Sequence, residues 1–234
     1  MSGIRRLLLG LFLVNSSASA QPQAPLSGIA RSQLCVTNGS VSTLPGGELE
    51  VDTPSSRAVV RMPSGQTAEV RFRYLGPSAQ SKPLASGEMR RQIGLKLRAQ
   101  DTCNLLYVMW HIEPDSGIAV SVKRNPGKRT HAECGAHGYV NLKPRVGTPM
   151  PRVLPGGAHR LRAELQGTEL SVFADGHLAW EGSVGGQVLE FDGPVGFRTD
   201  NARFAFSYFV SAPPSGQALQ ATGDATACVP SSGD

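Results

Sequence analysis

Apolar and polar residues alternate with a period of two in several stretches of the chain. The clearest are residues 68–74, 92–98 and 118–123, in which every second side chain is apolar. Successive side chains of a β-strand point to opposite faces, so this period predicts strands with one buried and one exposed face.

Other stretches add strands of different kinds. Residues 105–112 are almost uniformly apolar, which predicts a central strand covered on both faces. Residues 160–165 alternate again, and a Gln166-Gly167 turn leads to a further strand over 170–174. The pair Asp175-Gly176 predicts a tight hairpin, because a type I′ turn requires positive φ at both central residues. Residues 204–210 supply the last long strand.

Glycine and proline are spread through the chain, which has 27 and 17 of them, and helical periodicity is nearly absent. Such punctuation is typical of short strands joined by turns. The 40% of residues that are hydrophobic can form one sizeable core. We therefore expect a single all-β domain built as an antiparallel β-sandwich.

The ends of the chain differ from this pattern. Residues 1–20 combine two arginines, a short apolar run and the small residues Ala18 and Ala20, which predicts a cleavable signal peptide. The apolar run is too short to span a bilayer, and no other run reaches spanning length. We expect a polar lead-in over 21–33, the folded domain over 34–212, and a tail rich in proline, glycine and serine over 213–234.

The chain contains four cysteines, all after the predicted leader. An even number in an exported chain favours disulfides, and no pair has the C-x-x-C spacing of a zinc or thioredoxin site. Three pairings are open. We favour Cys35 with Cys228, which joins the chain ends, and Cys103 with Cys134, which joins two neighbouring strands.

Charge narrows the choice of partner. The excess of 23 lysines and arginines over 18 acidic residues is mild and does not favour nucleic acid as a ligand. Basic residues nevertheless recur on the polar sides of the predicted strands. They are Arg71, Arg73, Lys96, Arg98, Lys123, Arg124, Arg160 and Arg162. They either form a groove for carboxylate or sulfate groups or only solubilise an outer face.

Segments 159–182 and 191–212 resemble the concanavalin A-like lectin/glucanase superfamily, most of all the domain of 3-keto-disaccharide hydrolase-like and laminin G-like proteins. Three strand motifs carry the resemblance, over about a quarter of the chain. Their matching residues are Gly167, Leu170, Val172, Asp175 and Gly176; Gly193, Val195, Gly196, Phe197 and Thr199; and Phe204, Phe206, Phe209 and Val210. The resemblance implies a jelly-roll sandwich.

These motifs describe strand packing and assign no chemistry, because function belongs to sites grafted onto folds. The glucanases of the superfamily carry two glutamates and an aspartate as E-x-D-x-E on one strand. The closest segment here, Glu48 to Asp52, has the wrong order and is expected on an early edge strand. No calcium loop of the legume-lectin kind can be matched either.

The resemblance also places a saccharide on the concave sheet, and six residues are candidates to contact it there. They are Arg160, Arg162, Trp180, Arg198, Asp200 and Arg203. Because four of these are arginines, we expect tighter binding of acidic than of neutral polysaccharide.

His131, Glu133 and His137 crowd around Cys134 and are the candidates for holding a divalent metal. The alternative is a loop beside a disulfide, since glycines flank the cysteine. We expect no cofactor. A structural divalent cation is the alternative to that expectation.

The leading hypothesis is an exported carbohydrate-binding domain, secreted or periplasmic, that recognises an extended and anionic polysaccharide or glycoconjugate. One alternative is a divergent glycoside hydrolase or polysaccharide lyase. The other is an extracellular protein-interaction module.

Overall fold

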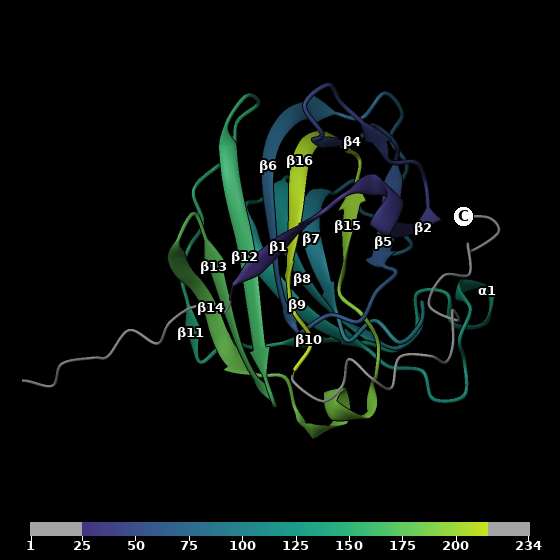
Figure 1. Ribbon diagram of the computed structural model, residues 1–234. Helices are drawn as coiled ribbons and strands as arrows, with labels where there is room; N and C mark the ends of the chain where they lie inside the picture. The colour runs from purple at the N-terminus through teal and green to yellow at the C-terminus, as the bar shows by residue number, and fades with distance from the viewer. Residues whose placement is uncertain (1–24, 215–234) are drawn as a thin grey trace, which may run out of the picture.

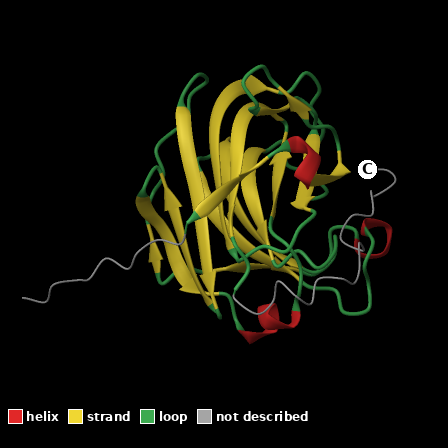
Figure 2. Cartoon of the chain, in the orientation of Figure 1, coloured by secondary structure: helices red, strands yellow, loops and turns green. Residues whose placement is uncertain are grey.

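The alternating segments pair into two antiparallel sheets that pack face to face (Figure 1). The structure is a computed structural model, and it describes residues 25–214. Strands make up most of the described chain, with only three short helical turns (Figure 2). The predicted all-β sandwich is confirmed.

The first sheet has nine strands. Eight of them follow the order β11-β14-β13-β12-β6-β16-β4-β3, and β1 pairs with β16 beside this path. Their bounds are β1 (Leu26–Ile29), β3 (Ser42–Thr43), β4 (Leu49–Val51), β6 (Thr67–Pro77), β11 (Val146–Gly147), β12 (Ala158–Gln166), β13 (Glu169–Ala174), β14 (His177–Ser183) and β16 (Ala202–Ser211).

The second sheet has seven strands in the order β10-β9-β8-β7-β15-β5-β2. Their bounds are β2 (Leu34–Asn38), β5 (Ser55–Val60), β7 (Arg91–Leu97), β8 (Leu105–Glu113), β9 (Gly117–Lys123), β10 (Tyr139–Leu142) and β15 (Gly196–Asp200). The helical turns are α1 (His131–Cys134) and two 3-10 turns, Arg31–Gln33 and Gly186–Glu190.

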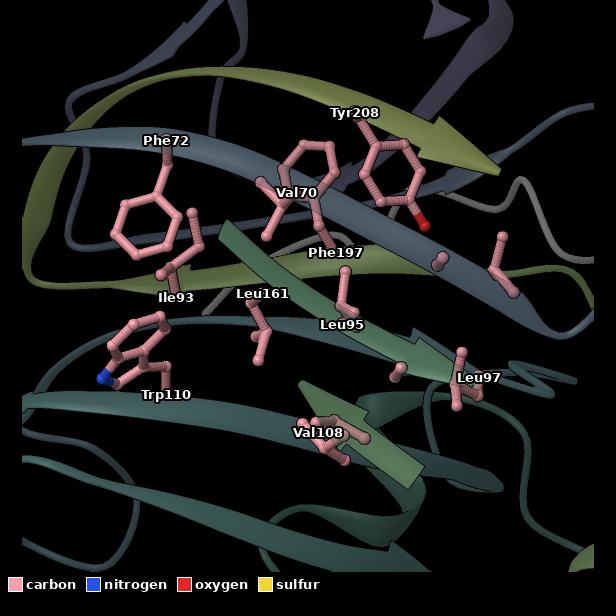
Figure 3. Close-up of a cluster of buried hydrophobic side chains, with 14 of the residues drawn as sticks. Val70, Phe72, Ile93, Leu95, Leu97, Val108, Trp110, Leu161, Phe197 and Tyr208 are labelled. Atoms are coloured by element: carbon pink, nitrogen blue, oxygen red, sulfur yellow. The ribbon is translucent and has the colours of Figure 1, made fainter. Parts of the chain in front are cut away.

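The core lies between the sheets and receives side chains from both (Figure 3). Val70 and Phe72 of β6 meet Leu95 of β7 and Trp110 of β8, all of them 2% exposed or less. Phe72 and Trp110 pack edge to face with ring centroids 5.6 Å apart. Full burial of each large apolar side chain contributes about 1.5–3 kcal/mol, so this alternation is the main source of stability.

Several local predictions are confirmed. Strand β8 is buried on both faces, as its apolar run predicts. Asp175 and Gly176 have φ of 51° and 86° and join the paired residues Ala174 and His177. The preceding turn is shifted by one residue, because Gln166 still pairs with Glu169 and the loop is Gly167-Thr168.

The ends of the chain lie only partly within the described residues. The stretch expected as a polar lead-in contributes β1, whose residues pair with Tyr208–Ser211 of β16. The predicted signal peptide and residues 215–234 lie outside the described residues. Within residues 25–214, no helix has the length and apolarity needed to cross a bilayer.

Cys103 and Cys134 form a disulfide, as predicted. It joins the loop before β8 to the end of α1, and not two strands as expected. Cys35 is also disulfide-bonded, and its predicted partner Cys228 lies outside the described residues.

Candidate functional site

The outer face of the seven-stranded sheet is the side that points away from the core. On β8, Leu106 and Val108 point into the core, whereas Tyr107 and Met109 belong to a second apolar cluster. Because side chains alternate along a strand, this second cluster lies on the outer face.

Strand register brings four cations together on this outer face. Arg198 of β15 lies opposite Arg57 of β5, and Lys96 of β7 lies opposite Tyr107 of β8. Lys123 of β9 lies opposite Tyr139 of β10. We call these residues the cationic face: Arg57, Lys96, Lys123 and Arg198, with Tyr107 and Tyr139.

Arg198 connects the two tyrosines to a carboxylate. Its Nε lies 2.7 Å from Asp200 Oδ2, and its Nη1 lies 3.5 Å from the Tyr139 hydroxyl. Its guanidinium carbon lies 5.3 Å from the centre of the Tyr107 ring, and the tyrosine rings stack with centroids 6.0 Å apart. Burial alone would lower the pKa of Arg198, but Asp200 and the two tyrosines together raise that pKa above its ordinary value. Arg198 therefore stays charged.

Asp200 is fully buried and acts as a support for Arg198. Its carboxylate also accepts hydrogen bonds from Gln92 Nε2 at 2.6 Å and from Ser55 Oγ at 3.1 Å. The predicted ligand contact at Asp200 is thus replaced by a positioning role, because no surface of the carboxylate is left for a ligand.

Lys123 is held by the loops that the disulfide joins. Its Nζ donates to the carbonyl oxygens of Thr102 at 3.1 Å and Gly135 at 2.7 Å. These residues directly neighbour Cys103 and Cys134. The ammonium lies 5.2 Å from the centre of the Tyr139 ring, within cation–π range.

Lys96 and His111 titrate far from their ordinary ranges. Burial lowers the pKa of Lys96 to about 7, and the charges of Arg57, Arg198 and Lys123 act in the same direction. Burial, then Arg90 and Arg198, lower the pKa of His111 to about 4. His111 is therefore neutral at pH 7, and the positive charge of this sheet resides in its arginines and lysines.

The sandwich separates the predicted ligand-binding arginines. Arg198 lies on the seven-stranded sheet, whereas Arg160, Arg162 and Arg203 lie on strands β12 and β16 of the other sheet. Arg162 pairs with Glu164 at 2.6 Å, and Arg203 pairs with Glu50 at 2.7 Å. The expected groove containing all four arginines does not form, because strand order puts them on opposite sides of the core.

Trp180 is also placed differently from the prediction. It pairs with Val172 across β13 and β14, and it is 2% exposed within the core. A ligand on either outer face cannot reach its ring.

The metal candidates do not converge either. Glu133 caps α1 by accepting the backbone N–H groups of Thr130 and Arg129 at 2.8 and 3.0 Å, which lowers its pKa to about 2. Across residues 25–214, no three His, Cys, Asp or Glu side chains are grouped to hold a metal ion, so His131 and His137 do not complete a site with Glu133.

The ligand-contacting residues predicted from the sequence did not include Arg57, Tyr107 or Tyr139. Arg57 sits in Ser56-Arg57-Ala58, where the same period of two that marks the other strands places it opposite the buried Ala58. This alternation can be read in the sequence, but it does not show which strand lies beside the strand that contains Arg57. Lys96 and Lys123 belong to the recurring basic residues of the sequence, and the structure brings these two together.

No family model and no curated protein matches the sequence. A carbohydrate-binding module, CBM66 from Bacillus subtilis, is similar in structure with a TM-score of 0.50 and 15% identity, covering 74% of this chain and 91% of that one. The Crh5 transglycosylase in complex with NAG has a TM-score of 0.47 and 12% identity, covering 80% and 83%. The Emp46p carbohydrate recognition domain, metal-free form, has values of 0.45 and 13%, covering 78% and 89%. The likeness to the first supports the two-sheet β-sandwich as the fold of this chain.

Proposed function

We propose that this chain is a carbohydrate-binding domain that recognises an extended anionic glycan on the cationic face. The observation that carries the proposal is the placement of four cations and two tyrosines on one part of the sheet, where Asp200 holds Arg198. Guanidinium and ammonium groups bind carboxylates and sulfates, and aromatic rings offer apolar surface to the C–H faces of sugars.

The fold is compatible with this function but does not assign it, since one sandwich serves many functions. The CBM66 structure is described as a carbohydrate-binding module, and it shares the sandwich at 15% identity. The charge of the outer face therefore supplies the argument for an acidic ligand.

We also propose that the protein works outside the cytoplasm, either secreted or in the periplasm. The leader-like residues 1–20 motivate this, and the Cys103–Cys134 disulfide fits an oxidising compartment.

Calorimetric titration with pectate or alginate, compared with a neutral glucan, tests the function. Tighter binding of the acidic polymer is expected at low ionic strength, and it should weaken as salt screens the charges. Tyr139→Ala should weaken binding several-fold, because the 40% exposed ring lies beside Arg198 and Lys123. Val140→Ala is the matched control, since Val140 is 55% exposed on the same strand and points to the other side.

Equal affinity for acidic and neutral polymers would contradict the anionic ligand. If neither polymer binds, a protein-interaction module takes the place of the glycan-binding proposal. Release of reducing sugar or a new unsaturated uronate absorbance would instead favour a glycoside hydrolase or polysaccharide lyase.

A further inference from the structure

Lys96 is a member of the cationic face that has almost no contact with solvent. It is 2% exposed on β7, between Gly196 of β15 and Tyr107 of β8. Its ammonium forms no hydrogen bond or ion pair with any other residue of the range 25–214. A buried ammonium without such partners is costly, so its charge depends on the surrounding field.

The charged groups around Lys96 come from three strands and one loop. Arg57 on β5, Arg198 on β15 and Lys123 on β9 oppose its protonation, whereas Asp101 in the loop before β8 favours it. Asp200 on β15 is already paired with Arg198. Together with burial, this surplus of positive charge brings the pKa of Lys96 to about 7.

We infer that binding of an anionic ligand to the cationic face is coupled to protonation of Lys96, so that affinity rises as the pH falls through neutrality. This inference rests on the proposed function. The negative groups of the ligand offset the repulsion from Arg57, Arg198 and Lys123 and so favour the ammonium form. By linkage, the added ammonium charge strengthens binding of the ligand to the same degree.

His111, Tyr139 and the carboxylates of the ligand do not change their protonation between pH 6 and pH 8.5. The carboxylates of a uronate polymer have an ordinary pKa near 4 and stay ionised. His111, with a pKa of about 4, stays neutral, and burial raises the pKa of Tyr139. Within this window the coupling therefore reports on Lys96.

Titration of pectate into the full chain at several pH values, in two buffers of different ionisation enthalpy, measures both consequences. We expect the Kd to fall roughly 3- to 10-fold from pH 8.5 to pH 6, since each unit of pKa change corresponds to a tenfold change in affinity. We also expect net uptake of up to one proton near pH 7.5.

Lys96→Met should abolish the proton uptake and this pH dependence. The matched control is Lys82→Met, because Lys82 is an exposed lysine in the loop before β7. Lys96→Arg, which is protonated at every pH, should bind as tightly at pH 8.5 as at pH 6.

The outcomes separate this inference from the proposed function. If pectate binds at the cationic face with no proton uptake, or if Lys96→Met keeps the uptake, the inference is wrong while the proposed function stands. If no acidic glycan binds at any pH, both are wrong.

Discussion

The two outer faces of the sandwich carry similar numbers of basic residues but differ in how these residues are paired with carboxylates. On the nine-stranded sheet, Arg71 pairs with Glu69 at 2.6 Å and Arg73 pairs with Glu48 at 2.7 Å. Arg162 and Arg203 have glutamate partners as well. On the seven-stranded sheet, Arg57, Lys96, Lys123 and Arg198 lie together, and Arg198 pairs with Asp200 at 2.7 Å.

If the cationic face binds anions as proposed, the carboxylates of a face, more than its arginines, distinguish the two faces. Exposed ion pairs contribute little to stability, but they neutralise the surface on which they lie. In the proposed function, the cations of the seven-stranded sheet supply the positive field that attracts the ligand. Each prediction below tests whether the two faces differ in this way.

The largest effect is expected from the disulfide under the cationic face. Replacing Cys103 and Cys134 together with serine should lower the free energy of unfolding by about 2–5 kcal/mol. It should also weaken pectate binding, because the carbonyls that hold Lys123 neighbour the two cysteines. Urea denaturation and calorimetric titration measure the two losses.

Unchanged binding by that double variant would show that Lys123 does not need these loops. Non-reducing peptide mapping of the parent chain tests the pairing predicted for the other two cysteines. A peptide linking Cys35 to any cysteine except Cys228 would contradict it.

Lys96→Met should stabilise the protein by roughly 2–4 kcal/mol at pH 6, where the parent chain must bury the charged amine. The pKa of Lys96 is lower in the folded state than its ordinary value of 10.5. The unfolded chain therefore binds more protons between about pH 7 and pH 10.5, and the parent gains stability as the pH rises through that window. Urea denaturation at pH 6, 8 and 9.5 should show the advantage of the variant shrinking. A stability advantage of the variant that does not change with pH would contradict the lowered pKa of Lys96 in the folded state.

Arg198→Ala should weaken binding of acidic polysaccharide about tenfold, since a charge-assisted contact contributes about 1.5–3 kcal/mol. Arg73→Ala should change affinity less than about twofold, because Arg73 lies on the nine-stranded sheet, across the core from the cationic face. Affinity electrophoresis in gels containing pectate compares the two variants directly. Equal losses would mean that the faces do not differ as proposed.

The smallest effect is expected from Arg203→Ala. It removes the exposed ion pair with Glu50, which should cost about 0–1 kcal/mol of stability and leave glycan binding unchanged. Thermal denaturation and the same titration measure both. A clear loss of binding would place the ligand on the nine-stranded sheet.

Local patterns in the sequence were sufficient for most of the longer strands. Alternation located β6, β7, β9 and β12, and the Asp175-Gly176 pair located a hairpin with both residues at positive φ. The continuous apolar run of β8 indicated burial on both faces. These features depend on neighbouring residues only, so a single sequence contains them.

The candidate site depends on strand order, which is not local. Alternation gives the side of a strand that a residue occupies, but not the sheet in which the strand lies. Arg162 and Arg198 therefore looked alike in the sequence and lie on opposite sides of the core. Trp180 looked exposed beside Glu181, but its pairing with Val172 turns it into the core.

Strand β1 has a consequence for behaviour at high concentration. Strand β4 covers one side of β16 only along Phe204–Phe206, and β1 covers the same side along Tyr208–Ser211. A chain shortened to begin at Leu34 would leave that stretch with unpaired N–H and C=O groups along an open edge. Such an edge is a template for pairing with another molecule and hence for aggregation. By pairing with Tyr208–Ser211, the four residues of β1 therefore remove this template.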